Sequence, residues 1–167
     1  MIEQRTTEGP AGAGTSRGEL DRALKLWVVL ARASAAVERH AEADAARDGL
    51  TLTEFGILEA LLHRGRLRAG ELQEKVLVTS GGTTYLVDRL EKRGLVRRAD
   101  DVGDRRVRYV ELTPEGEELA RASFARHARE IARAVSGLTP EEQERAIELL
   151  RTLGRAAAAL PPTSSAA

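Results

Sequence analysis

Apolar residues recur at helical spacing along most of this chain of 167 residues. The repeat predicts four helices in the first 93 residues, over about 20–47, 51–64, 68–76 and 79–93. Three of the four are followed by a glycine, the residue type that most often closes a helix: Gly49, Gly65 and Gly94. The first part of the chain therefore reads as one long helix and three shorter ones.

Two further helices are expected in the C-terminal third. Thr113-Pro114-Glu115 and Thr139-Pro140-Glu141 each place a proline at the first helical position, directly after a threonine that can serve as the N-cap. By the same reasoning Thr51 or Thr53 caps the second helix, and the spacing from Thr51 to Glu54 matches a capping box.

Residues 95–112 break the helical pattern. Two short β-prone runs flank the polar turn from Asp100 to Asp104, which predicts a hairpin. The hairpin carries five arginines: Arg97, Arg98, Arg105, Arg106 and Arg108. A helix followed by such a hairpin can occupy two adjacent DNA grooves, with the helix in the wide groove and the arginines in the narrow one. We therefore predict a mainly α fold with a winged helix-turn-helix over about residues 50–112.

The outer helices carry apolar stripes that the central module leaves uncovered. These helices lie over about 19–47 and 113–160, and the commonest partner for such stripes is a second copy of the chain. The expected organisation is a domain over 19–160 with N- and C-terminal dimerisation helices. Residues 1–18 and 161–167 hold little that could pack, so both ends are expected to be disordered.

Composition excludes several classes of protein. The chain has no cysteine, which excludes disulfides, cysteine–zinc sites and thiol switches. No apolar run approaches membrane-spanning length and no signal peptide is recognisable, so we expect a cytoplasmic protein without a membrane partner. The histidines and carboxylates show no metal-ligand spacing, and no nucleophile–base pair or phosphate-cradling loop is evident. We expect no metal, no cofactor and no catalysis, which disfavours a small helical enzyme.

The net charge is zero, yet the charge is unevenly distributed. Residues 64–108 hold 12 Lys/Arg against 7 Asp/Glu, whereas both flanks have an excess of carboxylates. Phosphates would be attracted to the middle of the chain and repelled by its ends.

The segment from Ser80 to Val96, which reads SGGTTYLVDRLEKRGLV, resembles the recognition helix of the multiple-antibiotic-resistance regulator (MarR) family. The family's wing pattern is present as Asp104-x-Arg106 followed by Leu112-Thr113. The run from Leu52 to Leu58 looks like the family's second helix, and the resemblance extends over about residues 20–155. Tyr85 stands where many relatives carry a basic residue, so the preferred base sequence is expected to differ.

The resemblance implies a homodimeric transcription factor, usually a repressor, bound to double-stranded DNA at a pseudo-palindromic operator. In the family a small aromatic or phenolic molecule commonly relieves repression. The segment from Leu26 to Ala33, together with the residues around Ser80, looks like a subgroup associated with quinone or catechol responses.

Residues of two kinds are candidates for DNA binding. Arg106 is the expected wing tip in the minor groove, with Asp104 supporting it by charge-assisted hydrogen bonds. The other candidates carry side chains suited to phosphates or base edges: Ser80, Thr83, Thr84, Tyr85, Arg89, Arg68 and Lys75. Capping or an ordinary solvated surface is the competing interpretation for most of them, whereas Arg89 could equally pair with carboxylates such as Asp88 or Glu91.

Five side chains are candidates for an effector pocket between the first helix, the second helix and the helix after the wing: Trp27, Phe55, His63, Phe124 and His127. Core packing is the alternative, and it is favoured for Phe55 and Phe124. The alternative function is a winged-helix dimer that serves as a protein-interaction module without sequence-specific DNA binding.

Overall fold

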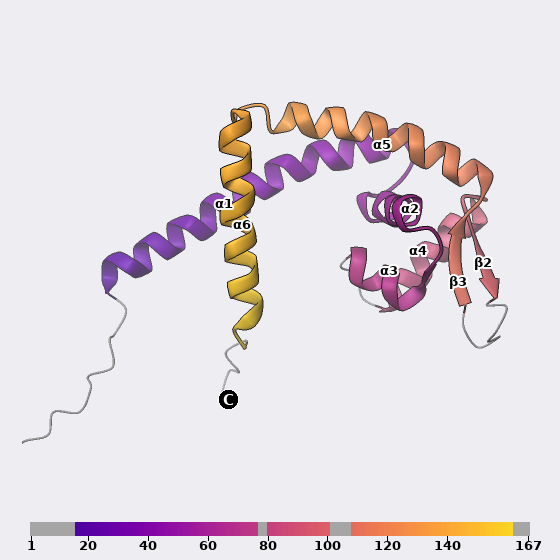
Figure 1. The fold of residues 1–167 in the computed structure, drawn as a ribbon, viewed down its shortest axis with the longest axis horizontal. Helices are drawn as coiled ribbons and strands as arrows, with labels where there is room; N and C mark the ends of the chain where they lie inside the picture. Colours follow the sequence, from indigo (N-terminus) through magenta and orange to yellow (C-terminus); the bar gives the residue numbers. More distant parts are fainter. Residues whose placement is uncertain (1–15, 77–79, 101–107, 162–167) are drawn as a thin grey trace, which may run out of the picture. The chain divides into compact units, whose positions relative to one another are not determined.

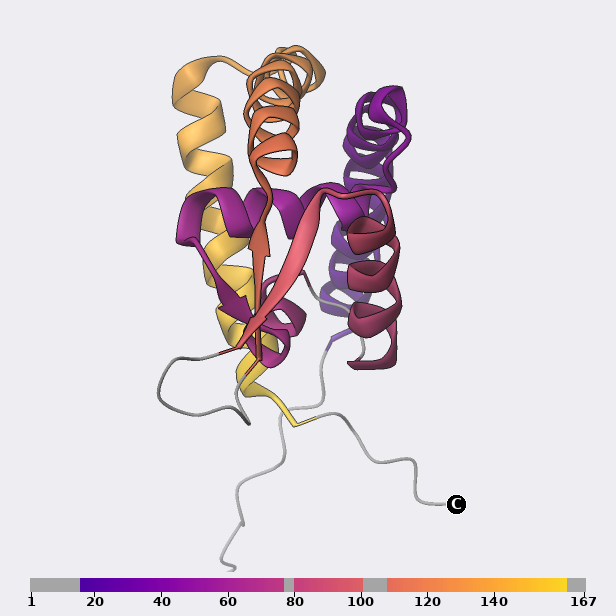
Figure 2. The same ribbon diagram turned by 90° about the vertical axis from the view of Figure 1, so that its right-hand side faces the viewer.

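The computed structural model describes residues 16–76, 80–100 and 108–161. It is a mainly α chain with one small antiparallel sheet (Figures 1 and 2). In chain order the elements are α1 (Arg17–Ala45), the 3-10 turn η1 (Ala46–Asp48), α2 (Leu52–Arg64), β1 (Leu67–Arg68), α3 (Ala69–Val76), α4 (Ser80–Lys92), β2 (Val96–Asp100), β3 (Arg108–Leu112), α5 (Pro114–Ala134) and α6 (Pro140–Ala159). The predicted fold class is confirmed, and the helices and the two wing strands occur in the expected order.

The chain divides into two compact units, Met1–Ala36 and Val37–Ala167. In the first unit the structure describes the beginning of α1, which starts at Arg17, inside the arm that we expected to be disordered. The rest of that arm lies outside the described residues, as does most of the expected C-terminal tail. The second unit contains the end of α1 and all of the other elements.

Two helix ends are closed by the same glycine motif. At the end of η1, Gly49 takes up a left-handed conformation with φ 65°, and the Leu50 N–H donates to the Ala45 carbonyl over 3.2 Å. At the end of α4, Gly94 has φ 72° and the Leu95 N–H donates to the Leu90 carbonyl over 3.0 Å. Both are Schellman motifs, as the glycines in the sequence led us to expect.

The helix starts follow the predicted caps. Thr51 rather than Thr53 caps α2, in a full capping box with Glu54. Thr113 caps α5, and Thr139 caps α6 in a second capping box.

The sheet has one strand more than the predicted hairpin. Its order is β1–β3–β2, and β1 pairs with β3 through Leu67↔Val110 and Arg68↔Tyr109. We expected Arg68 to begin the third helix, but the helix begins one residue later because Arg68 is extended and pairs with the wing. The Arg68 N–H donates to the Glu71 carboxylate over 2.7 Å, which forms one half of a capping box at the start of α3.

The core of the second unit lies where α2, α3, α4, the sheet and the first half of α5 meet. Contacts join α2 to α5 and α3, and α3 to α4. The largest fully buried apolar side chains are Ile57, Leu58, Leu72, Leu90, Val87 and Val96. These are helix-face and strand positions that the apolar repeat predicts, so the sequence pattern locates the core correctly.

The start of α5 is fixed against the turn that ends α4. Strand β3 leads directly into α5 (Figure 2), and the Thr113 N–H donates to the Leu95 carbonyl over 3.1 Å while its hydroxyl donates to the Gly94 carbonyl over 2.6 Å. Gly116 lies so close to this turn that a Cβ built on it would be 1.8 Å from the Leu95 carbonyl oxygen. Only glycine fits at this position.

Large apolar side chains remain exposed on the outer helices. In the first unit α1 exposes a set that includes Leu20, Leu24, Leu26, Trp27, Val28 and Val29. In the second unit no residue of α6 is buried, and its large exposed apolar side chains are Ile147, Leu149, Leu150 and Leu153, followed by Leu160 at the C-cap. Among the described residues, no helix combines the length and apolarity needed to cross a bilayer.

We expect Gly116→Ala to destabilise the protein by about 1–3 kcal/mol, because the added methyl group collides with backbone that cannot move without disrupting the α4–β2 turn. The matched control is Gly70→Ala in α3, where a Cβ would have no neighbour within 4 Å. Urea denaturation of both variants checks this. Equal stabilities of Gly116→Ala and the parent would mean that α5 does not approach Leu95 as closely as described.

Candidate nucleic-acid interface

Two consecutive side chains in the first half of α4 lie at the surface. Thr84 is exposed and Tyr85 has 61% of its surface accessible. Ser80 is the first residue of the helix, as expected for a residue near the N-terminus of a DNA-reading helix. Thr83 differs from our expectation: it is only 2% exposed and lies on the inner side of α4, where the adjacent Val87 also packs.

The helix is held in place by a buried carboxylate from α2. Glu54 is fully buried, and its Oε1 lies 3.2 Å from Nε of Arg89, while its Oε2 accepts the capping hydrogen bond from the Thr51 N–H. The Arg89 contact is an ion pair without hydrogen-bond geometry. The Arg89 guanidinium also lies 6.0 Å from the centre of the Tyr85 ring. Arg89 thus joins α4 to α2, a partner that local sequence could not reveal.

A second arginine fixes the wing to the same helix. Arg98 on β2 pairs with Asp88 and Glu91, both on α4. The hydrogen bond to Asp88 and the charges of both carboxylates raise the pKa of Arg98 above its ordinary value, although burial opposes the shift. Arg98 is therefore a structural residue that links the wing strand β2 to α4.

The tip of the wing lies outside the described residues. Arg106, the supporting Asp104 and Arg105 all belong to residues 101–107. Near the base of the wing, Arg97 donates from Nε to Glu111 over 2.7 Å, and at the tip end of the strands Arg108 lies 3.9 Å from Asp100. The strands that carry the tip are paired over five residues each.

A cluster of two arginines and a tyrosine lies beside the wing strands. The Arg66 guanidinium is 4.5 Å and that of Arg68 is 5.6 Å from the centre of the Tyr109 ring. A terminal guanidinium nitrogen of Arg68, Nη2, also donates to the Tyr109 hydroxyl over 3.4 Å. Sequence reasoning selected Arg68 but missed Arg66 and Tyr109, because their proximity depends on the unexpected strand β1.

An open groove of about 640 Å³ lies along α2 and α3. His63 and Lys75 line it, together with Glu38, Glu59 and Arg64 and smaller side chains. Among the described residues, no group of three or more histidines or carboxylates is arranged to hold a metal ion.

The five candidates for an effector pocket differ in their burial and in what surrounds them. His63 lines the groove and also meets the Phe124 ring edge-on, with ring centroids 4.8 Å apart. Phe55 is buried in the core and its ring centroid lies 4.4 Å from that of His127. Trp27 is 66% exposed in the first unit.

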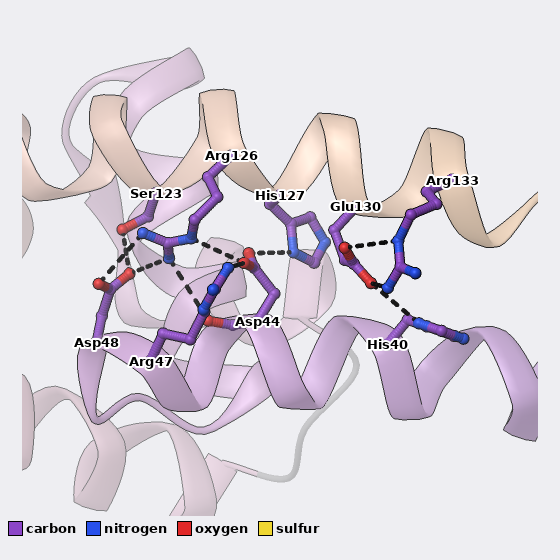
Figure 3. A network of polar contacts seen from close by, with 9 residues as sticks. All are labelled: His40, Asp44, Arg47, Asp48, Ser123, Arg126, His127, Glu130 and Arg133. Atoms are coloured by element: carbon purple, nitrogen blue, oxygen red, sulfur yellow. Dashed lines mark hydrogen bonds and ion pairs between the residues drawn. The ribbon is translucent and has the colours of Figure 1, made fainter.

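A polar network joins the end of α1 to α5 (Figure 3). Asp44 is almost fully buried and accepts from Nε of Arg126 over 2.7 Å, and His127 Nδ1 lies 3.3 Å from its other oxygen. Asp48 accepts from Ser123 and from Arg126. Further along α5, Glu130 pairs with both Arg133 and His40.

Two carboxyl groups of this network, those of Asp48 and Glu130, have lowered pKa values. Burial pushes the pKa of Asp48 upward, but hydrogen bonds from Arg126 and Ser123 outweigh it, and the pKa lies below its ordinary value of 3.8. Hydrogen bonds from Arg133 and His40 lower the pKa of Glu130 from 4.5 to about 2.

Comparison with known proteins identifies the arrangement. Residues 50–107 match the model of the MarR family. The chain is 40% identical over 136 residues to YkoM, an uncharacterized HTH-type transcriptional regulator of Bacillus subtilis, and the match spans 81% of this chain and 88% of YkoM.

Two solved structures share the fold. Sco3205, a MarR family transcriptional regulator from Streptomyces coelicolor solved in complex with DNA, superposes with a TM-score of 0.74 at 30% identity, over 93% of this chain and 95% of that one. BpsR of Bordetella bronchiseptica, whose DNA binding is regulated by 6-hydroxynicotinic acid, superposes with a TM-score of 0.66 at 27% identity, over 78% of this chain and 98% of that one.

The ion pairs of Glu130 should stabilise the fold only while Glu130 is charged. Because its pKa is lower in the folded state, this contribution is complete above about pH 5 and is lost as the pH falls towards about 2. Urea denaturation should therefore show that Glu130→Gln is less stable than the parent near neutral pH and that the difference disappears in acid. Glu118→Gln, an exposed carboxylate on the same helix, is the control. A Glu130→Gln difference that is constant over this range would contradict the pairing.

Proposed function

Because the chain belongs to the MarR family of transcriptional regulators, we propose that this DNA-binding regulator, which is not an enzyme, is a homodimeric repressor released by a small aromatic or phenolic molecule. In this proposal α4 enters the major groove of a pseudo-palindromic operator and the wing enters the neighbouring minor groove. The observation that supports the proposal is the exposed pair Thr84 and Tyr85 on α4, a helix that Glu54 holds against α2 and Arg98 holds against the wing strands.

We assign the contacts with bases and phosphates according to exposure. Thr84 and Tyr85 are the base-edge candidates, and Ser80 lies at the helix N-terminus, where backbone N–H groups can bind a phosphate. The buried Thr83 contributes by setting the position of the helix. We expect Arg89 to contribute less to DNA binding than these residues, because any phosphate contact would compete with its ion pair to Glu54.

The remaining cations lie around this helix. Lys75 is exposed at the end of α3, and Arg68 is exposed at its start. We propose that both bind phosphates and that Arg66 joins Arg68 in this role, since each guanidinium stacks near the Tyr109 ring. Arg106 remains the proposed minor-groove residue, with Asp104 orienting it, on the strength of the wing motif.

We propose that the dimer forms through the exposed apolar faces of α1 and α6. The row Ile147, Leu150 and Leu153 recurs every three residues along α6, and burying it against a second copy would remove it from water. Two copies related by a twofold axis would present two α4 helices to half-sites about one helical turn apart.

The open groove along α2 and α3 supports the effector proposal. Its basic side chains His63, Arg64 and Lys75 suit the acidic oxygen of a phenol or an aromatic acid, and Leu52 and Val76 provide apolar walls. The regulation of BpsR by 6-hydroxynicotinic acid is a precedent within the same fold. Because Lys75 is both a groove residue and a proposed phosphate contact, an effector bound there would interfere with DNA.

The alternative is a winged-helix dimer that binds a protein and has no sequence-specific DNA affinity. The exposed apolar faces would suit that function equally well. Operator binding separates the two proposals.

Purified protein should select a specific duplex from random-sequence DNA, and Arg106→Ala should weaken that complex by roughly tenfold without lowering the melting temperature. The control is Arg121→Ala, whose side chain is exposed on α5 and pairs with Glu117. Fluorescence anisotropy measures both affinities. Equal affinities of the two variants would show that the wing does not contact DNA. Failure to select any sequence would favour the alternative function.

Leu150→Glu should convert the dimer to a monomer in sedimentation equilibrium, because it places a charge in the middle of the apolar row of α6. Thr152→Glu adds the same charge on the opposite side of that helix and should leave the dimer intact. A Leu150→Glu protein that remains dimeric would exclude α6 from the interface.

A further inference from the structure

We propose that Arg93 is a positioning residue that connects α5 to the DNA-reading helix through the backbone of Asp48 and Gly49. The inference depends on the proposed function only for its consequence, namely the orientation of α4 on DNA. The connection itself is a matter of contacts within the second unit.

Arg93 lies one residue beyond the end of α4 and reaches across to the end of η1. One of its terminal nitrogens donates to the Gly49 carbonyl over 2.8 Å, and the other donates to the Asp48 carbonyl over 2.8 Å. The last carbonyls of a helical segment lack partners within that segment, and a cation is favoured there. Arg93 therefore joins the two Schellman turns, at Gly49 and Gly94, to each other.

The same short segment is held from the other side by α5. The Asp48 carboxylate accepts hydrogen bonds from Ser123 and Arg126 (Figure 3), and Arg126 also binds the buried Asp44. The side chain of Asp48 thus binds α5, and its backbone carbonyl accepts a hydrogen bond from Arg93 at the end of α4. A displacement of α5 that moves Asp48 must also move the two carbonyls that hold Arg93.

Gly49 fixes the backbone conformation of the segment that carries these two carbonyls. Its left-handed conformation and the hydrogen bond from the Gly49 N–H to the Ala46 carbonyl, 3.0 Å long, fix the direction of both carbonyls. The end of α4 is also attached to α5 through Thr113 and Gly94, so this end of the helix has two attachments to α5, in addition to the ion pairs that hold the helix against α2 and β2. With two attachments, a movement of α5 would tilt α4 as well as translate it.

A small tilt at this end has a large effect at the other. A helix of 13 residues is about 20 Å long, so a rotation of about 5° at Arg93 moves its first residue by about 1.7 Å. Hydrogen bonds to base edges tolerate only a few tenths of an ångström. The link therefore places the control of DNA affinity at the end of α4 that is distant from its exposed first half.

Two other roles for Arg93 make different predictions. If Arg93 bound a phosphate, its loss would lower the salt dependence of DNA binding. If Arg93 only stabilised the fold, its loss would increase amide exchange in all helices alike, and the effect would not depend on substitutions in α5.

The connection is tested without DNA by amide hydrogen exchange. Ser123→Ala and Arg126→Gln should each increase exchange in the last turn of α4, relative to α2 amides, by about threefold or more. In an Arg93→Met background neither change should have a further effect on that ratio, because the connection is already broken. Arg129→Gln, an exposed arginine on the same helix, is the matched control. Additive effects in the double variants would overturn the proposal.

The consequence is tested on the selected DNA duplex. Arg93→Met should weaken specific binding by about threefold or more with an unchanged slope of log affinity against log salt, and Arg93→Lys should retain part of the affinity. A slope that falls by about one unit would identify a phosphate contact, and an unchanged affinity would leave Arg93 with no positioning role; either result overturns the proposal. If the parent protein binds no specific DNA, the proposed function fails, while the exchange experiment still decides the connection.

Discussion

The close approach of α5 to the turn at Gly94 and Leu95 is the constraint on which the rest of the second unit depends. Three elements meet there: α4 ends, the first wing strand begins, and the N-cap of α5 binds the exposed carbonyls through Thr113. Gly116 is required because a Cβ would occupy the place of the Leu95 carbonyl. Once this turn is fixed, the direction of α4, the start of the wing and the start of α5 are no longer independent.

The ion pairs of the central module show how a chain without net charge can carry a basic surface. Several arginines of the basic middle segment neutralise carboxylates on neighbouring elements. Arg98 pairs with Asp88 and Glu91, and Arg89 pairs with the buried Glu54. These pairs fix elements to one another and contribute little positive field to the surface. The charge excess of residues 64–108 is therefore a poor measure of the charge available to a phosphate backbone. Lys75, which is exposed at the end of α3, is one of the remaining candidates for a phosphate contact.

Local signals in the sequence predict most of the fold. Caps, glycines and the apolar repeat depend only on neighbours along the chain, so the six helices and the paired wing strands could be predicted within a few residues. The strand β1 could not, because two residues such as Leu67 and Arg68 carry no period and become a strand only by pairing with β3. The effects of such distant pairing extend to the site, where the Arg66–Tyr109 contact was missed.

The candidate site was less predictable from the sequence than the fold. A run of hydroxyl side chains at the start of α4 indicates an exposed polar helix, but the sequence cannot say that Thr83 is turned inward beside Val87. The partners of Arg89 and Arg93 are more than 30 residues away in the chain, and no local spacing points to them. What the residues alone reveal is the kind of interface; which arginines face outward depends on the packing.

The central claim is that the exposed start of α4 and the wing meet DNA as one surface, twice in each dimer. Photo-crosslinking from a benzophenone placed at residue 85, with sequencing of the crosslinked bases on a selected duplex, tests it most directly. The account predicts crosslinks in the major groove of two half-sites about one helical turn apart, each flanked by a protected minor groove. Crosslinks spread evenly over the duplex, or confined to one half-site, would contradict it.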